Sequence, residues 1–190
     1  MTRLATVLIA VAAIAAPRLA LAAPPVWSVD HAASRLTFSG QVSGQGFTGA
    51  FKKWDAVIHF DPKDLAHSDV AATIDMTSFA TGSQDRDSEL PDEDWFWTSH
   101  FPTATFVAHG FTAAGPGRYN AAGVLTLRGA AKPLTLPFTL AITGDVAKMN
   151  GQVALSRLAF GIGQGEWQST DTVAAAVTVG VDLTADKAAH

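Results

Sequence analysis

Residues 172–183 read TVAAAVTVGVDL, and an apolar side chain stands at every second position from Val173 to Leu183. Alternation with a period of two places successive side chains on opposite faces of an extended strand. One face of this strand is therefore apolar throughout, whereas the other carries small or polar residues such as Thr178 and Asp182. Such a strand must bury its apolar face against other elements, so the stretch indicates a half-buried β-strand in a β-rich fold.

The same alternation recurs along most of the chain. Residues 134–142 read LTLPFTLAI, and Pro137 in the middle of them predicts an edge or a bulge, because proline has no N–H to donate to a neighbouring strand. Further alternating stretches lie at residues 34–43, 54–60, 69–76, 103–112, 119–127 and, less regularly, 151–158. Glycine, proline and asparagine turn residues separate these stretches, which predicts antiparallel strands joined by short turns.

About eight antiparallel strands bury all their apolar faces when the sheet closes into a barrel, which also removes the sheet edges. A two-sheet sandwich satisfies the same alternation. Small residues on the predicted inward faces favour a barrel with space along its axis: Gly40, Ala56, Ala72, Ala108, Ala121, Gly123 and Ala175. A barrel of this size is filled by its own side chains or holds one small ligand. We therefore predict an all-β protein with a single antiparallel barrel domain over residues 23–190.

One stretch interrupts the strands. Residues 78–106 read SFATGSQDRDSELPDEDWFWTSHFPTATF, far longer than an ordinary hairpin loop. We predict a short helix or lid near residues 82–100 that covers one end of the barrel and presses its aromatic side chains onto the opening. The acidic run at residues 92–94 follows Pro91 and is expected in the first turn of that helix. A helix that merely completes the core satisfies the same sequence.

The first residues are typical of an export signal. Arg3 precedes an apolar segment, Leu4–Ala16, which is shorter than a membrane span, and Ala20–Ala22 provides a small-x-small cleavage pattern. We predict that residues 1–22 are removed. The chain contains no cysteine, which excludes disulfides, thiol catalysis and an acylated N-terminal cysteine. These features predict a periplasmic protein.

Charge and motif content point away from catalysis. The formal net charge is −4, which gives no electrostatic reason to bind nucleic acid. The histidines are scattered without metal-ligand spacing, and no Gly-x-Ser-x-Gly elbow is present to hold a nucleophile. The acidic residues are numerous, but nothing in the sequence sets the separation that a glycosidase pair requires. We predict no catalytic residue, no metal site and no covalently bound cofactor.

Several residues and short segments, taken in order along the chain, resemble the YceI-like family of exported lipid-binding proteins. They are Trp27–His31, Gly49–Phe51, Ile58–Pro62, Ser78, Thr81, Arg86, Asp87, Leu90, Trp95, Phe96, Phe101, Pro102, Gly123–Gly129, Lys132–Leu134, Arg157, Phe160–Gly163, Asp171 and Val173. The segment from residue 123 to residue 129 is the most specific of them. Glu89 stands where the family often carries a histidine, and Trp95 and Trp97 replace smaller or acidic residues.

The resemblance implies an extended lipocalin-like barrel whose apolar channel holds a polyisoprenoid chain, such as that of an isoprenoid quinone. The protein is then a non-catalytic periplasmic carrier or storage protein. Alternation and the resemblance together predict these ligand-binding residues: Phe38, Trp54, Ile58, Ile74, Trp95, Phe96, Phe106, Leu125, Phe138 and Phe160. Arg86 and Asp87 either hold the ligand's head group or form a local structural pair.

An alternative function belongs to a different class. A barrel packed full of its own side chains predicts a structural or interaction module that acts beside a membrane redox partner. The carrier hypothesis is also compatible with transient contact between the protein and a membrane or a membrane redox protein. The sequence leaves monomer and homodimer open.

Overall fold

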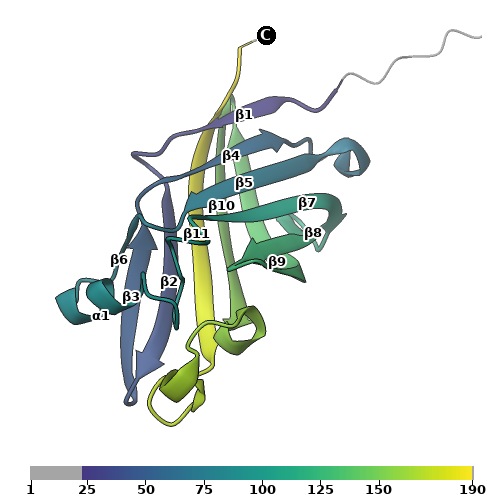
Figure 1. Ribbon diagram of the computed structural model, residues 1–190. Helices are drawn as coiled ribbons and strands as arrows, with labels where there is room; N and C mark the ends of the chain where they lie inside the picture. The colour runs from purple at the N-terminus through teal and green to yellow at the C-terminus, as the bar shows by residue number, and fades with distance from the viewer. Residues whose placement is uncertain (1–22, 190) are drawn as a thin grey trace, which may run out of the picture.

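The computed structural model describes residues 23–189 and contains eleven strands and four short helical segments (Figure 1). The predicted export signal, residues 1–22, lies outside the described residues. The strands are β1 Val26–Val29, β2 Arg35–Val42, β3 Gln45–Phe51, β4 Trp54–His59, β5 Asp69–Asp75, β6 Phe79–Ala80, β7 Thr103–Ala113, β8 Arg118–Leu127, β9 Ala130–Thr143, β10 Val146–Ser156 and β11 Ala176–Lys187. The helical segments are η1 Leu65–His67, α1 Gln84–Glu89, η2 Arg157–Phe160 and η3 Gly165–Gln168.

Eight of these strands form a closed antiparallel ring. The order is β1-β4-β5-β7-β8-β9-β10-β11, and pairing between β1 and β11 closes it. The closing pairs are Trp27 with Lys187, Ser28 with Asp186 and Val29 with Ala185. The predicted all-β barrel of about eight strands is therefore confirmed.

Strand β11 pairs with β10 along one edge and with two strands, β1 and β2, along the other. Its last residues pair with β1, whereas Thr178–Asp182 pair with β2 over Arg35–Ser39. Strands β3 and β6 continue the sheet beyond β2 and prolong the barrel wall past the closed ring. In Figure 1 the β2–β3 hairpin projects below the ring on the same side as α1. The barrel is thus closed around one end and extended at the other.

Local chemistry explains the turns and the proline. The β8–β9 turn uses Arg128 and Gly129 with φ angles of 49° and 73°, the left-handed pair that a two-residue hairpin requires. Pro137 lies in β9, and β9 is paired with β8 at this position. Pairing between β9 and β10 begins only at the next residue, Phe138 opposite Gly151, and continues to Thr143. Pro137 therefore occupies a locally free edge, as predicted.

The predicted helix is present but short. Helix α1 ends at Glu89, before Pro91, because a proline at that position cannot donate a backbone hydrogen bond to the preceding turn. The expectation that residues 92–94 occupy the first helical turn is wrong. These residues lie in successive turns after the helix, where the Trp95 N–H donates to the Asp92 carbonyl at 3.0 Å. Residues 90–101, termed the lid below, are therefore held mainly by turns.

Gly123 is required by close packing between β7 and β8. A Cβ added there would press against the Val107 carbonyl oxygen and lie 2.8 Å from the Ala108 Cα. We expect Gly123→Ala to lower the free energy of unfolding by about 3 kcal/mol, measured by urea denaturation. Gly46→Ala is the matched control, since nothing lies within 4 Å of a Cβ at Gly46. Equal stability of the two variants would contradict this packing argument.

Candidate ligand-binding cavity

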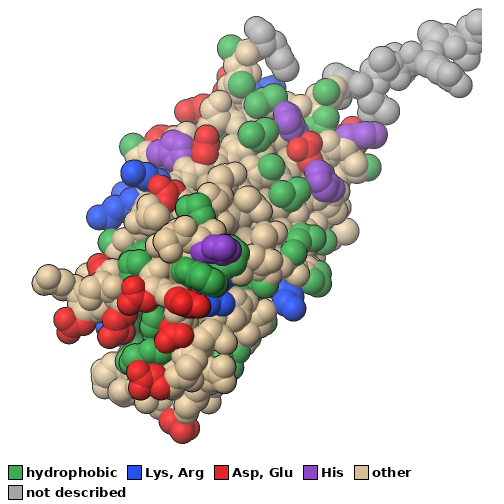
Figure 2. All heavy atoms as spheres, viewed as in Figure 1, with side chains coloured by type: hydrophobic (Ala, Val, Ile, Leu, Met, Phe, Trp, Pro, Cys, Tyr) green, Lys and Arg blue, Asp and Glu red, His purple; other side chains and the backbone are tan. Residues whose placement is uncertain are grey.

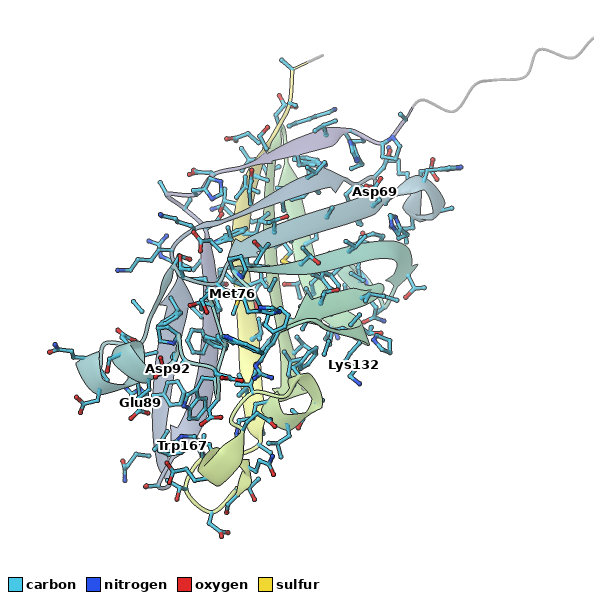
Figure 3. All side chains as sticks on the ribbon, in the orientation of Figure 1. Asp69, Met76, Glu89, Asp92, Lys132 and Trp167 are labelled. Atoms are coloured by element: carbon cyan, nitrogen blue, oxygen red, sulfur yellow. The ribbon has the colours of Figure 1, made fainter. Side chains whose placement is uncertain are left out.

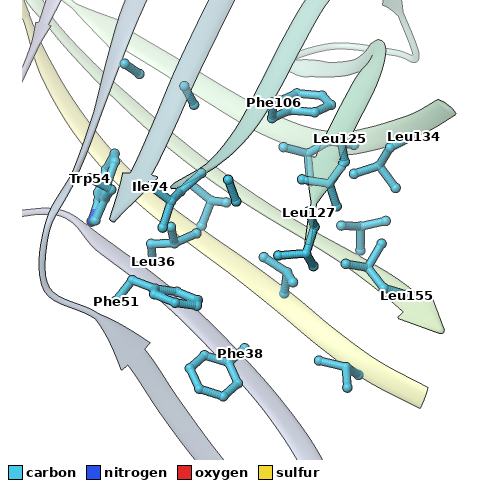
Figure 4. A pocket seen from close by; sticks show the side chains of 18 of the residues that line it. Leu36, Phe38, Phe51, Trp54, Ile74, Phe106, Leu125, Leu127, Leu134 and Leu155 are labelled. Atoms are coloured by element: carbon cyan, nitrogen blue, oxygen red, sulfur yellow. The ribbon is translucent and has the colours of Figure 1, made fainter. Parts of the chain in front are cut away.

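A cavity of about 290 Å³ runs through the barrel. Side chains from the ring strands, from β2 and β3 and from the lid line it. Of the described residues that line it, only Gln41 and Arg157 have polar side chains. Figure 4 shows Ile74, Phe106 and Leu125 projecting from neighbouring strands into the same space. Such a space offers apolar contact along its length and almost no hydrogen bonding, so it suits an apolar ligand.

Two apolar clusters mark the two ends of this cavity. The lid cluster consists of Phe38, Ile74, Met76, Leu90, Trp95, Phe96, Ala104, Phe160, Ile162 and Val173. The deep cluster consists of Trp27, Ile58, Phe60, Ala108, Phe111, Ala121, Leu136, Phe138, Ala147 and Ala185. Between them Ala56 and Ala72 face each other across β4 and β5 and both line the cavity. These small side chains leave open space between the two aromatic ends, and this middle section of the cavity is termed the waist below.

The structure brings most of the predicted ligand-binding residues together. Ten of them line this one cavity: Phe38, Trp54, Ile58, Ile74, Trp95, Phe96, Phe106, Leu125, Phe138 and Phe160. They come from six strands, the lid and η2. The position of the seven strand residues agrees with the inward faces read from alternation. Their contact with a ligand stays a prediction.

Arg86 and Asp87 stand outside the cavity lining and both bind Thr81. The Asp87 Oδ1 accepts hydrogen bonds from the Thr81 N–H at 2.9 Å and from its hydroxyl at 2.7 Å. The Arg86 Nε donates to the same hydroxyl at 3.3 Å, and its guanidinium lies 4.8 Å from the centre of the Phe47 ring. These contacts fasten α1 to the chain before it and to β3. The role of the two residues toward a head group stays a prediction.

The lid is fastened to the barrel on two sides. The Asp94 carbonyl accepts hydrogen bonds from the Gly163 N–H at 2.7 Å and the Gln164 N–H at 2.8 Å. On the other side the Arg128 Nη2 donates to the Glu93 carbonyl at 2.6 Å. Figure 3 places Glu89, Asp92 and Trp167 at the same end of the molecule, away from Asp69. The lid thus covers the extended end of the barrel, and its own Trp95 and Phe96 side chains are buried against the barrel.

Two residues with left-handed backbone meet at the edge of the lid. Trp97 and Arg128 both have a φ of 49°, which is uncommon for residues other than glycine. The Arg128 guanidinium lies 5.7 Å from the centre of the Trp97 ring, and His100 stacks on that ring at 4.6 Å. Acidic side chains gather over the same end of the molecule in Figure 2. The outer surface of the lid is therefore polar and acidic, whereas its inner surface is aromatic.

Arg157 is a buried cation at the lid end of the cavity. Its side chain is 3% exposed and donates to the backbone carbonyls of Ile162, Gly163, Trp167, Ser169, Val173 and Ala174 at 2.7–3.3 Å. Burial lowers the pKa of the Arg157 guanidinium, because removal from water disfavours its charged form. The guanidinium also lies 5.9 Å from the centre of the Trp95 ring. Arg157 therefore holds the connection between β10 and β11 in shape beneath the lid.

Sequence reasoning missed several residues at the deep end. Phe111 lines the cavity, although simple alternation from Ala104 through Ala108 assigns it to the outer face. A β-bulge between Ala108 and Gly110 inserts one residue and reverses the faces beyond it. Trp27 was missed as a lining residue because its strand has only four residues. Its indole Nε1 donates to the Phe60 carbonyl at 2.9 Å, which is the kind of partner that a buried tryptophan needs.

Polar side chains outside the cavity form small groups in the described part of the chain. Within residues 23–189, no group of three or more His, Cys, Asp or Glu side chains is placed to hold a metal ion. The contacts between histidine and aspartate are isolated surface pairs, such as His59 with Asp69 at 3.2 Å. Over the same residues, no helix is long and apolar enough to cross a membrane.

Comparisons with known proteins agree with this geometry. A family model described as a YceI-like domain matches residues 27–185. The protein YceI of Escherichia coli O157:H7 is 37% identical over 97 residues, which are 51% of this chain and 50% of that protein. The matched region thus spans about half the length of such curated relatives.

Solved structures show the same barrel. The crystal structure of BcnA from Burkholderia cenocepacia is similar with a TM-score of 0.79 and 35% identity, over 82% of this chain and 98% of that one. A domain from Saccharophagus degradans, described as a polyisoprenoid binding domain, has a TM-score of 0.69 at 15% identity. That similarity covers 86% of this chain and 99% of the domain.

Proposed function

The chain belongs to the YceI-like family, and on that premise we propose that it carries or stores an isoprenoid lipid, such as an isoprenoid quinone, without catalysing a reaction. The observation that carries this proposal is the cavity of about 290 Å³ with its almost entirely apolar lining. The description of the Saccharophagus degradans domain as polyisoprenoid binding supports the same class of ligand. That description names a polyisoprenoid only, and the quinone head group is our proposal.

Apolar burial alone supplies enough affinity for such a ligand. Burying one CH₂ group contributes about 0.8 kcal/mol, so a five-carbon prenyl unit contributes roughly 3–4 kcal/mol before association costs are subtracted. A few units therefore suffice for useful affinity without any polar recognition of the tail. This agrees with the cavity lining within residues 23–189, where the only polar side chains are Gln41 and Arg157, the latter already bonded to backbone carbonyls.

The proposal places the protein in the periplasm, where a carrier exchanges lipid with a membrane or with a membrane redox protein. The export signal expected at residues 1–22 and the absence of cysteine support this location. The alternative, an interaction module with a packed barrel, requires the interior to be filled by side chains. The alanine-lined waist of the cavity favours the carrier.

Tryptophan fluorescence tests the proposal directly. Trp27, Trp54 and Trp95 line the cavity, with Trp27 in the deep cluster and Trp95 in the lid cluster, so a quinone ring bound in the cavity lies near at least one of these indoles. We expect a prenylated ubiquinone to quench the emission in a saturable titration, because a quinone accepts an excited electron at short range. The tail-free benzoquinone with the same ring substituents is the matched control and should quench only by collision, without saturation. Equal quenching by both compounds would contradict the proposal.

A further inference from the structure

The barrel wall lacks a backbone ladder along part of the boundary between β9 and β10. These two strands pair from Phe138 opposite Gly151 to Thr143 opposite Val146. Residues 130–137 of β9 pair with β8, and residues 152–156 of β10 pair with β11. Between these two segments, both in the described part of the chain, no strand pairing is present. The boundary between them is termed the seam below.

The sequence of β9 keeps the seam unpaired. The Leu140 N–H of β9 donates to the Gly117 carbonyl, on the β8 side, at 2.9 Å. Successive residues of a strand point their backbone groups to opposite sides, so those of Pro133, Thr135 and Pro137 point toward β10. Two of these three residues are prolines, which have no N–H to donate. A regular ladder with β10 therefore cannot form along the seam.

Apolar side chains from both strands face each other across the seam. Continued in the register of the paired part, Leu136 would oppose Val153 and Leu134 would oppose Leu155. All four side chains line the cavity. Figure 4 shows Leu134 and Leu155 at the same side of the cavity. Side chains, and not backbone hydrogen bonds, therefore separate the cavity from the outer surface along the seam.

The seam is framed by hydrogen-bonded elements. The last ladder pair, Phe138 with Gly151, bounds one end of it. At the other end, η2 follows β10 directly and contacts both β9 and β10. A Cβ added at Gly161, just after η2, would lie 2.8 Å from the Arg128 Nη1, so the chain there rests against the β8–β9 turn. Side chains within the frame can thus move while the barrel stays folded.

The lid offers a more costly route into the cavity. Passage beneath it breaks the hydrogen bonds of the Asp94 carbonyl with the Gly163 and Gln164 N–H groups, and that of the Glu93 carbonyl with Arg128. Passage through the seam requires side-chain rotations, which are among the fastest motions of a protein. An isoprenoid chain is slender, so displaced leucine side chains suffice to admit it one unit at a time.

The charge of the two surfaces favours the same route. Acidic side chains gather over the lid end of the molecule (Figure 2). The outward residues along the seam are exposed and uncharged: Pro133, Thr135, Pro137, Gln152, Ala154 and Ser156. An apolar chain that slides over charged groups must strip water from them, which costs free energy. The rim of the seam imposes no such cost.

We infer that the isoprenoid chain enters and leaves the barrel sideways, through the seam between β9 and β10. This inference rests on the proposed function and adds to it the route of exchange. Leu134 and Leu155 act as the movable side chains of this gate, and Pro133 and Pro137 keep the backbone from closing it. The lid stays fastened while the lipid is exchanged.

Transfer of a bound prenylated ubiquinone to phospholipid vesicles, followed by the recovery of tryptophan emission, tests the inference. The chain has no cysteine, so Ala154→Cys at the rim gives one site for a maleimide-linked polyethylene glycol. We expect the label to slow release at least about 10-fold. The dissociation constant should stay within about 3-fold, because a blocked gate slows entry and exit alike.

Two labelled variants are the matched controls. Thr73→Cys places the same label on the exposed outer face of β5, and Asp92→Cys places it on the exposed surface of the lid. Both should release the quinone as fast as the unlabelled protein. Thr135→Cys, on the opposite rim, replaces Ala154→Cys if the latter fails to fold, as judged by circular dichroism.

The outcomes separate the inference from the proposed function. Slow release with the rim label and normal release with the two control labels support the inference. Normal release in all three proteins, with the quinone bound, overturns the inference and leaves the proposed function intact. Slow release with the lid label alone assigns the route to the lid and also overturns it. Absence of binding by the unlabelled, unchanged protein overturns both.

Discussion

Replacing Ala72 with phenylalanine is expected to weaken lipid binding at least about 100-fold while the barrel still folds. Ala72 lies on the inward face of β5, opposite Ala56 on β4 and Phe106 on β7, and lines the waist of the cavity. A phenyl ring there occupies the space of about one prenyl unit, and the loss of roughly 3–4 kcal/mol of burial weakens binding at least about 100-fold. The dissociation constant for an isoprenoid quinone measures the effect.

Ala71→Phe is the matched control for this change. Ala71 is the adjacent residue of β5 and faces outward, opposite Val57 and Val107 on the neighbouring strands. The control adds the same ring to the outer surface and should bind lipid as the unchanged protein does. Equal binding by both variants would show that the ligand does not occupy the cavity. Because the waist is hollow, the ligand-free Ala72→Phe protein should lose no more than about 3 kcal/mol of stability.

Replacing Arg157 with methionine is expected to cause the largest loss of stability. Six backbone carbonyls lose their donor, and a buried carbonyl without a partner costs about 1–3 kcal/mol. Some of these carbonyls regain water as the connection between β10 and β11 loosens, so we expect a net loss of about 4 kcal/mol. For a domain of this size, that loss lowers the melting temperature by roughly 8–16 °C.

Two further variants make the Arg157 prediction specific. Arg157→Lys should recover little of the stability, because an ammonium group has three donors and lacks the planar fork of five. Arg118→Met, at an exposed arginine of β8, should change the free energy of unfolding by less than about 0.5 kcal/mol. A loss below about 1 kcal/mol in Arg157→Met would contradict the proposed role of the six hydrogen bonds.

Alternation alone predicts most of the barrel, and it fails where pairing is decided at a distance. Residues 172–183 were predicted as one strand, whereas β11 begins at Ala176 and continues to Lys187. The earlier residues form isolated contacts instead, such as the bridge of Val173 with Val42. The later residues become a strand because β1 pairs with them and closes the ring. Strand β1 has only four residues, too few to show a pattern from which its pairing with β11 could be predicted.

Most residues that line the cavity were predictable from the sequence, whereas the contacts of Arg157 and the turns of the lid were not. Seven of the ten predicted lining residues lie on strands, where alternation identifies the inward face, because a strand with one buried face reports its own orientation. Phe111 escaped because the bulge before it reverses the alternation. The partners of Arg157 are backbone carbonyls, which every residue carries, so no pattern of side chains can reveal them. The acidic residues at 92–94 were placed in a helix that Pro91 ends.

Native mass spectrometry with organic extraction, applied to protein purified from its own host, tests the central claim most directly. It reports whether the barrel carries a lipid in the cell and gives the mass of that lipid. The account predicts one co-purifying species whose mass corresponds to an isoprenoid with a defined number of prenyl units. A protein without bound lipid, which also takes up neither ubiquinone nor a polyprenyl lipid when these are offered, would contradict it.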